Sequence, residues 1–233
     1  MKIALLKCGT PPADLMHIAG DFSQMFFSLF SKVSSEISWQ VYDLTKKEYP
    51  LSMDEVSGFI STGSGHSVYD DNPWINQYCD FVKNLFKKEK KFIGICFGHQ
   101  MIAHALGGKT VNSNRGWGVG LKKIKIYKAM KWMEPPLSEY HLLVSHKDQV
   151  EILPPQAVLL GGNSHCPKAM FQLQDHFLGI QAHPEFTSAF AKALMHKRAH
   201  FIESSIFEKA LPTMNYQTHS LEMANWMLNF LKC

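Results

Sequence analysis

The sequence lacks the features that mark disulfide-rich, metal-binding and membrane proteins. Its five cysteines include no Cys-x-x-Cys pair, which argues against both a disulfide framework and a zinc site. No apolar run approaches the roughly 18 residues of a membrane span, and Lys7 interrupts the first run too early for a secretion signal. We therefore expect a reducing, cytoplasmic setting, with no metal and no membrane partner.

Charge is also sparse and nearly balanced. Charged residues make up 19% of the 233 residues, the formal net charge is +4, and hydrophobic residues make up 45%. This composition is typical of a globular chain with a packed core. The lysine-rich run at 86–91 lacks any base-reading motif, so we interpret it as the solvated end of a helix and expect no nucleic-acid partner.

The first half of the chain alternates short apolar runs with segments of helical periodicity. Such runs are typical of strands buried on both faces, and a β-α-β order predicts a parallel sheet with helices on both sides. The strands expected here are Ile3–Cys8, Trp39–Leu44, Gly58–Ser61 and Phe92–Ile95. The helices expected here are Asp14–Val33, one that begins at Pro73, and Gly98–Leu106.

The second half is richer in strand patterns. The expected strands are Leu121–Tyr127, Leu142–Ser145, Ala157–Leu160, Ala169–Leu173 and Leu178–Ala182. Two helices are expected after them, over Thr187–Lys209 and His219–Lys232. No repeat, low-complexity tract or linker interrupts the chain, so we expect residues 1–233 to form a single mixed α/β domain.

One segment contains a candidate nucleophile. Cys96 lies between Gly94 and Gly98, where an apolar strand is expected to turn into a helix. The glycines leave room for a tight, strained turn that projects the residue between them. A helix N-terminus favours the thiolate, and the N–H of Phe97 is then well placed to donate to an oxyanion. The alternative is a buried structural cysteine, the commoner fate of cysteines in such runs.

A candidate base follows later in the chain. His183 and Glu185 lie two residues apart at the end of an expected strand, so both side chains should point to the same side. Pro184 favours extended geometry at His183. The carboxylate then holds the imidazole tautomer that accepts the thiol proton. His99, in the helix after Cys96, is expected to pack against the sheet and not to serve as a second base.

These segments resemble those of the class I (triad) glutamine amidotransferase family. They are Gly-Ile-Cys-Phe-Gly-His-Gln at 94–100 and Gly-Ile-Gln-Ala-His-Pro-Glu at 179–185. A third, Val-Ser-His-Lys-Asp-Gln-Val at 144–150, is similar to the family's Ser-His-x-Asp-x-Val segment. The resemblance covers nearly the whole chain and is greatest to the free-standing branch of γ-glutamyl peptidases and GMP-synthase-like amidotransferase proteins. It implies a flavodoxin-like α/β fold, with a mostly parallel central sheet, helices on both faces and a small antiparallel addition.

The resemblance also implies roles for individual residues. The residues that match the catalytic triad are Cys96, His183 and Glu185. Those that match the backbone donors of the oxyanion hole are Gly63 and Phe97. Around the first of these donors, Thr62 and Ser64 depart from the family's usual Ser-Gly-Gly-Pro loop. The residues that match substrate-binding positions are Gln100, Ser145 and His146.

The chemistry implied is hydrolysis of a γ-glutamyl amide through a γ-glutamyl thioester, with no metal or organic cofactor. The chain is then either a glutaminase, alone or supplying ammonia to a separate synthase subunit, or a free-standing hydrolase of γ-glutamyl peptides or conjugates. The sequence has no P-loop and no Ser-Gly-Gly-x-Asp ATP-pyrophosphatase motif, so the second alternative stays open. A catalytically silent regulatory module is a third alternative, whose mark would be a broken triad. Specificity is expected to depend on the loops at 64–74 and 112–120.

Overall fold

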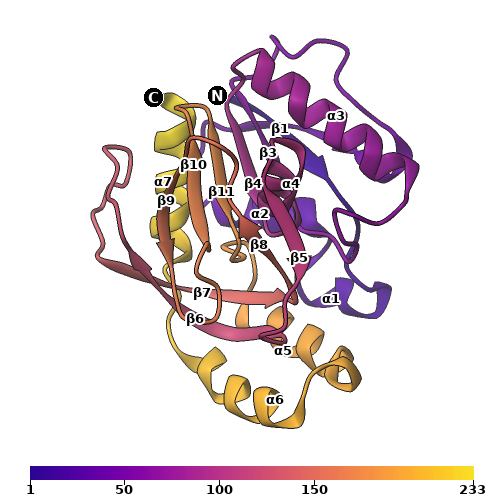
Figure 1. Cartoon of the computed structure of the whole chain (residues 1–233), viewed down its shortest axis with the longest axis vertical. Coiled ribbons are helices and arrows are strands. Elements are labelled where there is room, and N and C mark those ends of the chain that lie inside the picture. The colour runs from indigo at the N-terminus through magenta and orange to yellow at the C-terminus, as the bar shows by residue number, and fades with distance from the viewer.

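The computed structural model describes residues 1–233, and a nine-stranded sheet forms its centre (Figure 1). The strands of this sheet are β1 (Lys2–Lys7), β2 (Ser38–Asp43), β3 (Gly58–Ser61), β4 (Phe92–Ile95), β6 (Gly118–Ile126), β7 (Glu139–His146), β9 (Ala157–Gly162), β10 (Met170–Leu173) and β11 (Phe177–Ile180). Their order across the sheet is β2-β1-β3-β4-β11-β10-β9-β6-β7. Two further strands, β5 (Lys109–Asn112) and β8 (Asp148–Ile152), pair with each other.

The sheet is parallel in one half and antiparallel in the other. β2, β1, β3, β4 and β11 lie side by side in parallel. β10, β9, β6 and β7 continue the sheet with antiparallel pairing. Every residue of β3, β4 and β11 is buried, as expected for strands covered on both faces. The predicted α/β architecture, a largely parallel sheet with an antiparallel addition, is confirmed.

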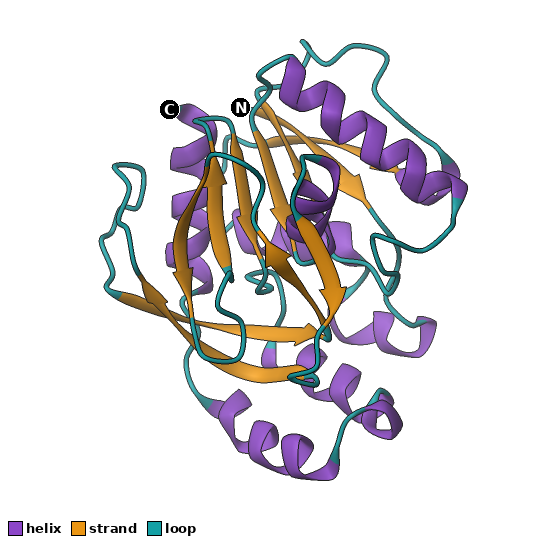
Figure 2. Ribbon diagram, viewed as in Figure 1, coloured by secondary structure: helices purple, strands orange, loops and turns teal.

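Helices cover both faces of the sheet (Figure 2). The α-helices are α1 (Met16–Ala19), α2 (Phe22–Phe30), α3 (Pro73–Lys87), α4 (Phe97–Ala105), α5 (Ser188–Lys197), α6 (Ser204–Ala210) and α7 (Ser220–Lys232). α2 and α7 share one hydrophobic cluster with the sheet, and α3 and α4 share another. α5 and α6 pack instead against the β6–β7 pair. None of these helices is both long and apolar enough to cross a membrane.

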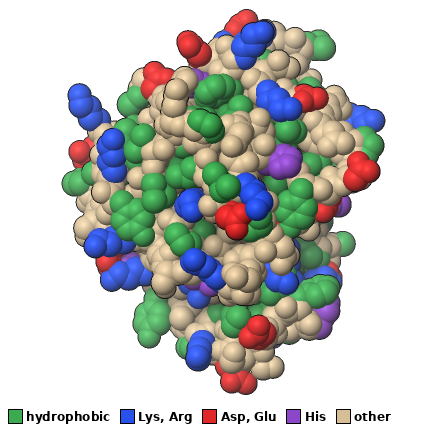
Figure 3. Space-filling model, viewed as in Figure 1, with side chains coloured by type: hydrophobic (Ala, Val, Ile, Leu, Met, Phe, Trp, Pro, Cys, Tyr) green, Lys and Arg blue, Asp and Glu red, His purple; other side chains and the backbone are tan.

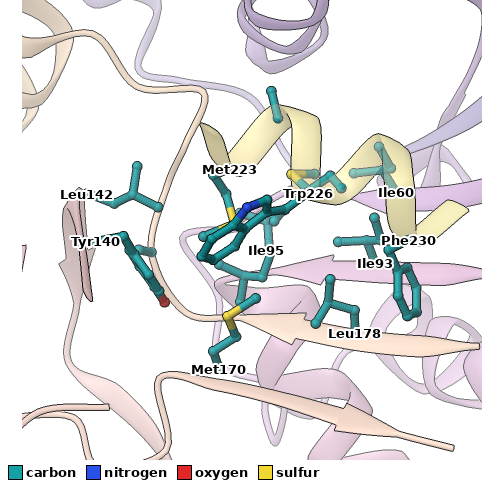
Figure 4. Packing of buried hydrophobic residues seen from close by; sticks show 14 of the residues in the cluster. Ile60, Ile93, Ile95, Tyr140, Leu142, Met170, Leu178, Met223, Trp226 and Phe230 are labelled. Carbon is teal, nitrogen blue, oxygen red and sulfur yellow. The ribbon is translucent and has the colours of Figure 1, made fainter. Parts of the chain in front are cut away.

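The core beneath α7 is filled by large apolar side chains. Trp226 of α7 lies beside Ile95 (Figure 4). Phe230, further along the same helix, lies near Ile93 and Leu178, whose strands β4 and β11 are neighbours. Trp226 is fully buried, and its indole N–H donates to the carbonyl oxygen of Pro135 at 2.8 Å. Because this N–H keeps a hydrogen-bond partner, the indole is buried without an unsatisfied donor. The parallel strands therefore rest on a well-packed layer.

The prediction of a single helix over Asp14–Val33 is wrong. Gly20 interrupts it with φ of 75°, in a region that glycine adopts without strain. Asp21 then begins α2 with a capping box, which satisfies the first N–H groups of the new helix.

The prediction of a single helix over Thr187–Lys209 is wrong as well. α5 ends at Lys197, and a short 3-10 turn at Ala199–Phe201 follows. Ile202 is then extended, with φ of −104° and ψ of 129°, so that α6 begins as a separate helix.

The lysine-rich run lies where a solvated helix end was expected. α3 ends at Lys87, and the side chains of Lys87 and Lys88 are exposed. On the face drawn in Figure 3, Lys and Arg side chains lie among Asp and Glu and do not form one basic patch.

Candidate active site

Three neighbouring strands end at the same edge of the sheet. β3, β4 and β11 are adjacent and parallel, so the segments that follow them meet at their carboxyl ends. These segments carry Gly63, Cys96 and His183. The order of the strands thus brings together residues that are far apart in the sequence.

Cys96 lies on a sharp turn between β4 and α4. Its φ of 51° and ψ of −95° are unusual for a residue with a side chain and indicate local backbone strain. The turn leaves no room for side chains on either side of it. A Cβ on Gly94 would overlap the carbonyl group of Gly98, and a Cβ on Gly98 would overlap the Ser61 hydroxyl. Both glycines are therefore required by close contacts.

We expect Gly98→Ala to lower the free energy of unfolding by about 1–3 kcal/mol, the usual cost of overpacking. Because the new methyl group meets the Ser61 side chain, adding Ser61→Gly should recover part of this loss. Denaturant unfolding of the two single variants and the double variant measures their coupling, which we expect to exceed about 0.5 kcal/mol. Gly65→Ala is the matched control, since its Cβ meets nothing within 4 Å. Additive effects of the two substitutions would contradict a direct clash.

His183 is held by a carboxylate and by an aromatic ring. Its Nδ1 lies 2.7 Å from Oε1 of Glu185, and both side chains are almost fully buried. The ring of Phe186 stacks on the imidazole with their centres 3.9 Å apart. Because a carboxylate oxygen accepts, Nδ1 carries the proton of this bond. The other ring nitrogen, Nε2, is then free to exchange a proton with a neighbouring thiol.

The local geometry of this pair differs from the extended strand that was expected. β11 ends at Ile180, and His183 forms only an isolated bridge with Leu143. Pro184 and Glu185 lie in a turn, which the hydrogen bond from Phe186 N to His183 O closes at 3.4 Å. The contact between imidazole and carboxylate therefore forms within a turn.

The surroundings of His183 favour its charged form. Burial acts to lower the pKa of His183, but the Glu185 carboxylate and the Cys96 thiol outweigh it, so that the pKa is raised. A raised pKa keeps the proton on the imidazole near neutral pH, where an imidazolium stabilises a neighbouring thiolate.

Gly63 and Phe97 lie beside the candidate nucleophile. Phe97 is the first residue of α4, where N–H groups lack acceptors within the helix. The N–H of Gly63 makes no backbone hydrogen bond. A Cβ on Gly63 would lie 2.7 Å from His183 Cε1 and 3.6 Å from Cys96 Cβ, so this glycine lies next to both. The role of the two N–H groups as oxyanion donors stays a prediction.

Two adjoining cavities open beside these residues. The nucleophile cavity, of about 190 Å³, is lined by Cys96 and by mostly polar side chains. The base cavity, of about 370 Å³, is lined by His183 and Gly63. Ser145 and Arg198 line both cavities, at the boundary between them.

The residues predicted to bind substrate all line the nucleophile cavity: Gln100, Ser145 and His146. Nε2 of Gln100 donates to the carbonyl oxygen of Asp148 at 2.8 Å. Nδ1 of His146 donates to the same oxygen at 3.1 Å, and burial lowers the pKa of His146 to about 3, so this ring is neutral. Contact of these residues with substrate stays a prediction.

His99 occupies the position expected of it. It is fully buried, and its ring centre lies 4.8 Å from that of Phe171 on β10. Burial lowers the pKa of His99 to about 3. It thus packs against the sheet, away from the reacting groups.

Sequence reasoning gave no role to two residues near the candidate nucleophile, Gln181 and Arg198. Nε2 of Gln181 donates to Sγ of Cys96 at 3.5 Å. Its place two residues before His183, in a segment already singled out, was the signal that could have found it. The Arg198 guanidinium lies 5.6 Å from the Trp117 ring centre, and nothing in the sequence marks that pairing.

All five cysteines are free thiols, and no cluster of three or more His, Cys, Asp or Glu side chains is arranged to hold a metal ion.

Comparison with known families supports the same assignment. The family model described as glutamine amidotransferase class-I matches residues 22–201. The chain belongs to this family. This membership confirms the resemblance seen in the motifs around Cys96 and His183.

Similar proteins in the family include γ-glutamyl peptidases of Arabidopsis thaliana. Gamma-glutamyl peptidase 4 is 34% identical over 193 residues, which cover 79% of this chain and 76% of the relative. Gamma-glutamyl peptidase 3 is 30% identical over 226 residues, which cover 91% and 89%. A glutamine-hydrolysing GMP synthase of Clostridium botulinum is 33% identical over 143 residues, which cover 59% of this chain and 27% of the synthase.

Solved structures agree on the fold. A glutamine amidotransferase from Thermotoga maritima superposes with a TM-score of 0.76 at 18% identity, covering 100% of this chain and 96% of the other. One from Methylobacillus flagellatus gives 0.74 at 18% identity, with coverage of 99% and 92%. The predicted class I amidotransferase fold is confirmed.

Proposed function

We propose that the protein hydrolyses a γ-glutamyl amide through a triad of Cys96, His183 and Glu185. The observation that carries the proposal is a thiol on a strained turn at a helix N-terminus, at the strand edge where a buried imidazole is held by a carboxylate at 2.7 Å. Family membership and similarity to γ-glutamyl peptidases support an amide-hydrolysing enzyme.

The reaction proceeds in two halves. The Cys96 thiolate attacks the γ-carbonyl carbon, a carbon–sulfur bond forms, and the N–H groups of Gly63 and Phe97 donate to the oxyanion. His183 gives its proton to the leaving nitrogen as the carbon–nitrogen bond breaks. Water then attacks the thioester while His183 accepts its proton, which releases glutamate and regenerates the thiolate.

Two substrate classes fit this chemistry. Similarity to GMP synthase favours a glutaminase that supplies ammonia to a separate synthase subunit. Similarity to γ-glutamyl peptidases over most of both chains favours a free-standing hydrolase of γ-glutamyl peptides. No metal or organic cofactor has a role in either reaction scheme.

We further propose that residues 1–233 act as one catalytic domain in the cytoplasm. Every strand that positions a triad residue belongs to the same sheet. A reducing compartment suits the chemistry, since Cys96 must stay a free thiol.

A diazo-ketone analogue of glutamine tests the proposal directly. We expect one adduct per chain, on Cys96, when the full-length protein is treated near neutral pH and mapped by mass spectrometry. The exposed Cys233 is the internal control, because it is accessible but lies in no catalytic arrangement. Absence of an adduct, or equal labelling of both thiols, would favour a catalytically silent module.

A further inference from the structure

Arg198 is a cation without an acidic partner beside the reacting groups. It follows α5, which packs against β7 (Figure 1). Its guanidinium donates only to Ser145, at 2.8 Å to the hydroxyl and 3.5 Å to the carbonyl oxygen. It forms no ion pair with any Asp or Glu. Burial lowers the pKa of Arg198, and the nearby Cys96 thiolate opposes that shift only in part. A half-buried cation with no carboxylate partner is costly, so this position suits an anionic ligand.

The position of the leaving group follows from the transfer of a proton from His183 to the leaving nitrogen. His183 must protonate the leaving nitrogen, so the leaving group has to lie on the side of the imidazole. Of the two cavities, the base cavity is the one that His183 lines, whereas Cys96 lines the other. The base cavity is therefore the place for the leaving amine.

The base cavity is large enough for a leaving amine much bigger than ammonia. Its volume of about 370 Å³ lies within the range of ordinary small-molecule sites. Apolar side chains form much of its wall: Phe22, Phe186, Phe190 and Leu194. Arg198 is its only Lys, Arg, Asp or Glu residue. A guanidinium beside these four apolar side chains matches an amine that carries a carboxylate and an apolar side chain.

We propose that Arg198 binds the carboxylate of the leaving group, so that the preferred substrates are γ-glutamyl amino acids or peptides with a free carboxylate. This inference rests on the proposed function, because it assigns the leaving group of the thioester-forming step. Arg198 is a specificity-determining residue in this assignment and takes no part in bond making.

Two matched substrates test the assignment: γ-glutamyl-phenylalanine and its C-terminal amide. For the full-length wild-type protein, we expect kcat/KM to be about 10²-fold higher for the free acid, since a buried charge pair is lost with the amide. In Arg198→Met the preference should disappear, through a loss of about 10²-fold on the acid and less than about 3-fold on the amide. Arg198→Lys should keep part of the preference.

Lys197→Met is the matched control. It removes one positive charge from the neighbouring residue, whose Nζ pairs with Asp14 at 2.7 Å and lines neither cavity. We expect this variant to keep the wild-type rates on both substrates.

The outcomes separate this inference from the function on which it rests. Equal losses on acid and amide in Arg198→Met would overturn the inference, because Arg198 would then act through Ser145 or the thiolate. A wild-type protein that cleaves both peptides equally, or releases ammonia from glutamine while cleaving neither peptide, would overturn it and leave the proposed function standing. Failure to cleave glutamine and both peptides would overturn the proposed function itself.

Discussion

Replacing Cys96 with alanine should abolish γ-glutamyl hydrolysis. The substitution removes the nucleophile, so no thioester can form, and we expect kcat to fall by at least about 10⁴-fold, as for other covalent catalysts that lose their nucleophile. Cys96→Ser should also be severely impaired, because a hydroxyl is far less ionised than a thiol near neutral pH. Amine release from γ-glutamyl peptides and ammonia release from glutamine are the two measurements.

Folding must be intact for this result to be meaningful. Cys96 is buried, but the change to alanine removes only one sulfur atom, so the melting temperature should stay close to that of the wild type. Cys233→Ser, at the exposed last residue, is the matched cysteine variant and should keep full activity. Substantial hydrolysis by folded Cys96→Ala would exclude the proposed triad.

Substituting glutamine for Glu185 should lower kcat/KM by roughly 10²–10⁴-fold at neutral pH. Glu185 raises the pKa of His183, so removing its charge lowers that pKa. His183 then loses its proton at a lower pH, so that no imidazolium remains near neutral pH to stabilise the thiolate. Cys96 therefore ionises only at a higher pH. The acid limb of the pH–rate profile should therefore move upward, and alkylation of Cys96 by iodoacetamide at pH 7 should slow.

A carboxylate elsewhere provides the control for this charge change. Glu151 lies on β8 and pairs at the surface with Lys109, at 2.7 Å, so Glu151→Gln should leave the pH–rate profile and the rate of alkylation at pH 7 unchanged. If Glu185→Gln loses activity while Cys96 is alkylated at pH 7 as fast as in the wild type, the carboxylate does not act by shifting the ionisation of the Cys96–His183 pair.

The parallel half of the fold could be predicted because its signals are local and strong. Short apolar runs such as Phe92–Ile95 are buried on both faces, so every residue in them is apolar and the strand is recognisable from sequence. β5 and β8 were missed because their sequences, Lys-Thr-Val-Asn and Asp-Gln-Val-Glu-Ile, contain too few apolar residues to show a clear strand pattern. Their partners lie about forty positions apart, and only pairing makes them strands.

Helix ends were predicted less well than helices. Apolar residues continue at helical spacing across Gly20 and across Ile202, so periodicity joined helices that the backbone separates. The φ of 75° at Gly20 and the extended conformation at Ile202 are the backbone features that separate these helices. Periodicity reports the buried face of a helix and carries little information on where the chain turns away.

The sequence by itself determined the triad candidates and the family. The turn at the nucleophile and the His-Pro-Glu segment each need a particular local backbone geometry, and that geometry requires residue types that can be recognised in the sequence. Only the tertiary structure placed Gly63 against His183, Gln181 against Cys96, and Arg198 at the boundary of two cavities. Those contacts depend on which strands are neighbours and on how α5 docks beside β7. Local residue spacing does not predict the strand order or the docking of α5, because both depend on packing between residues far apart in the sequence.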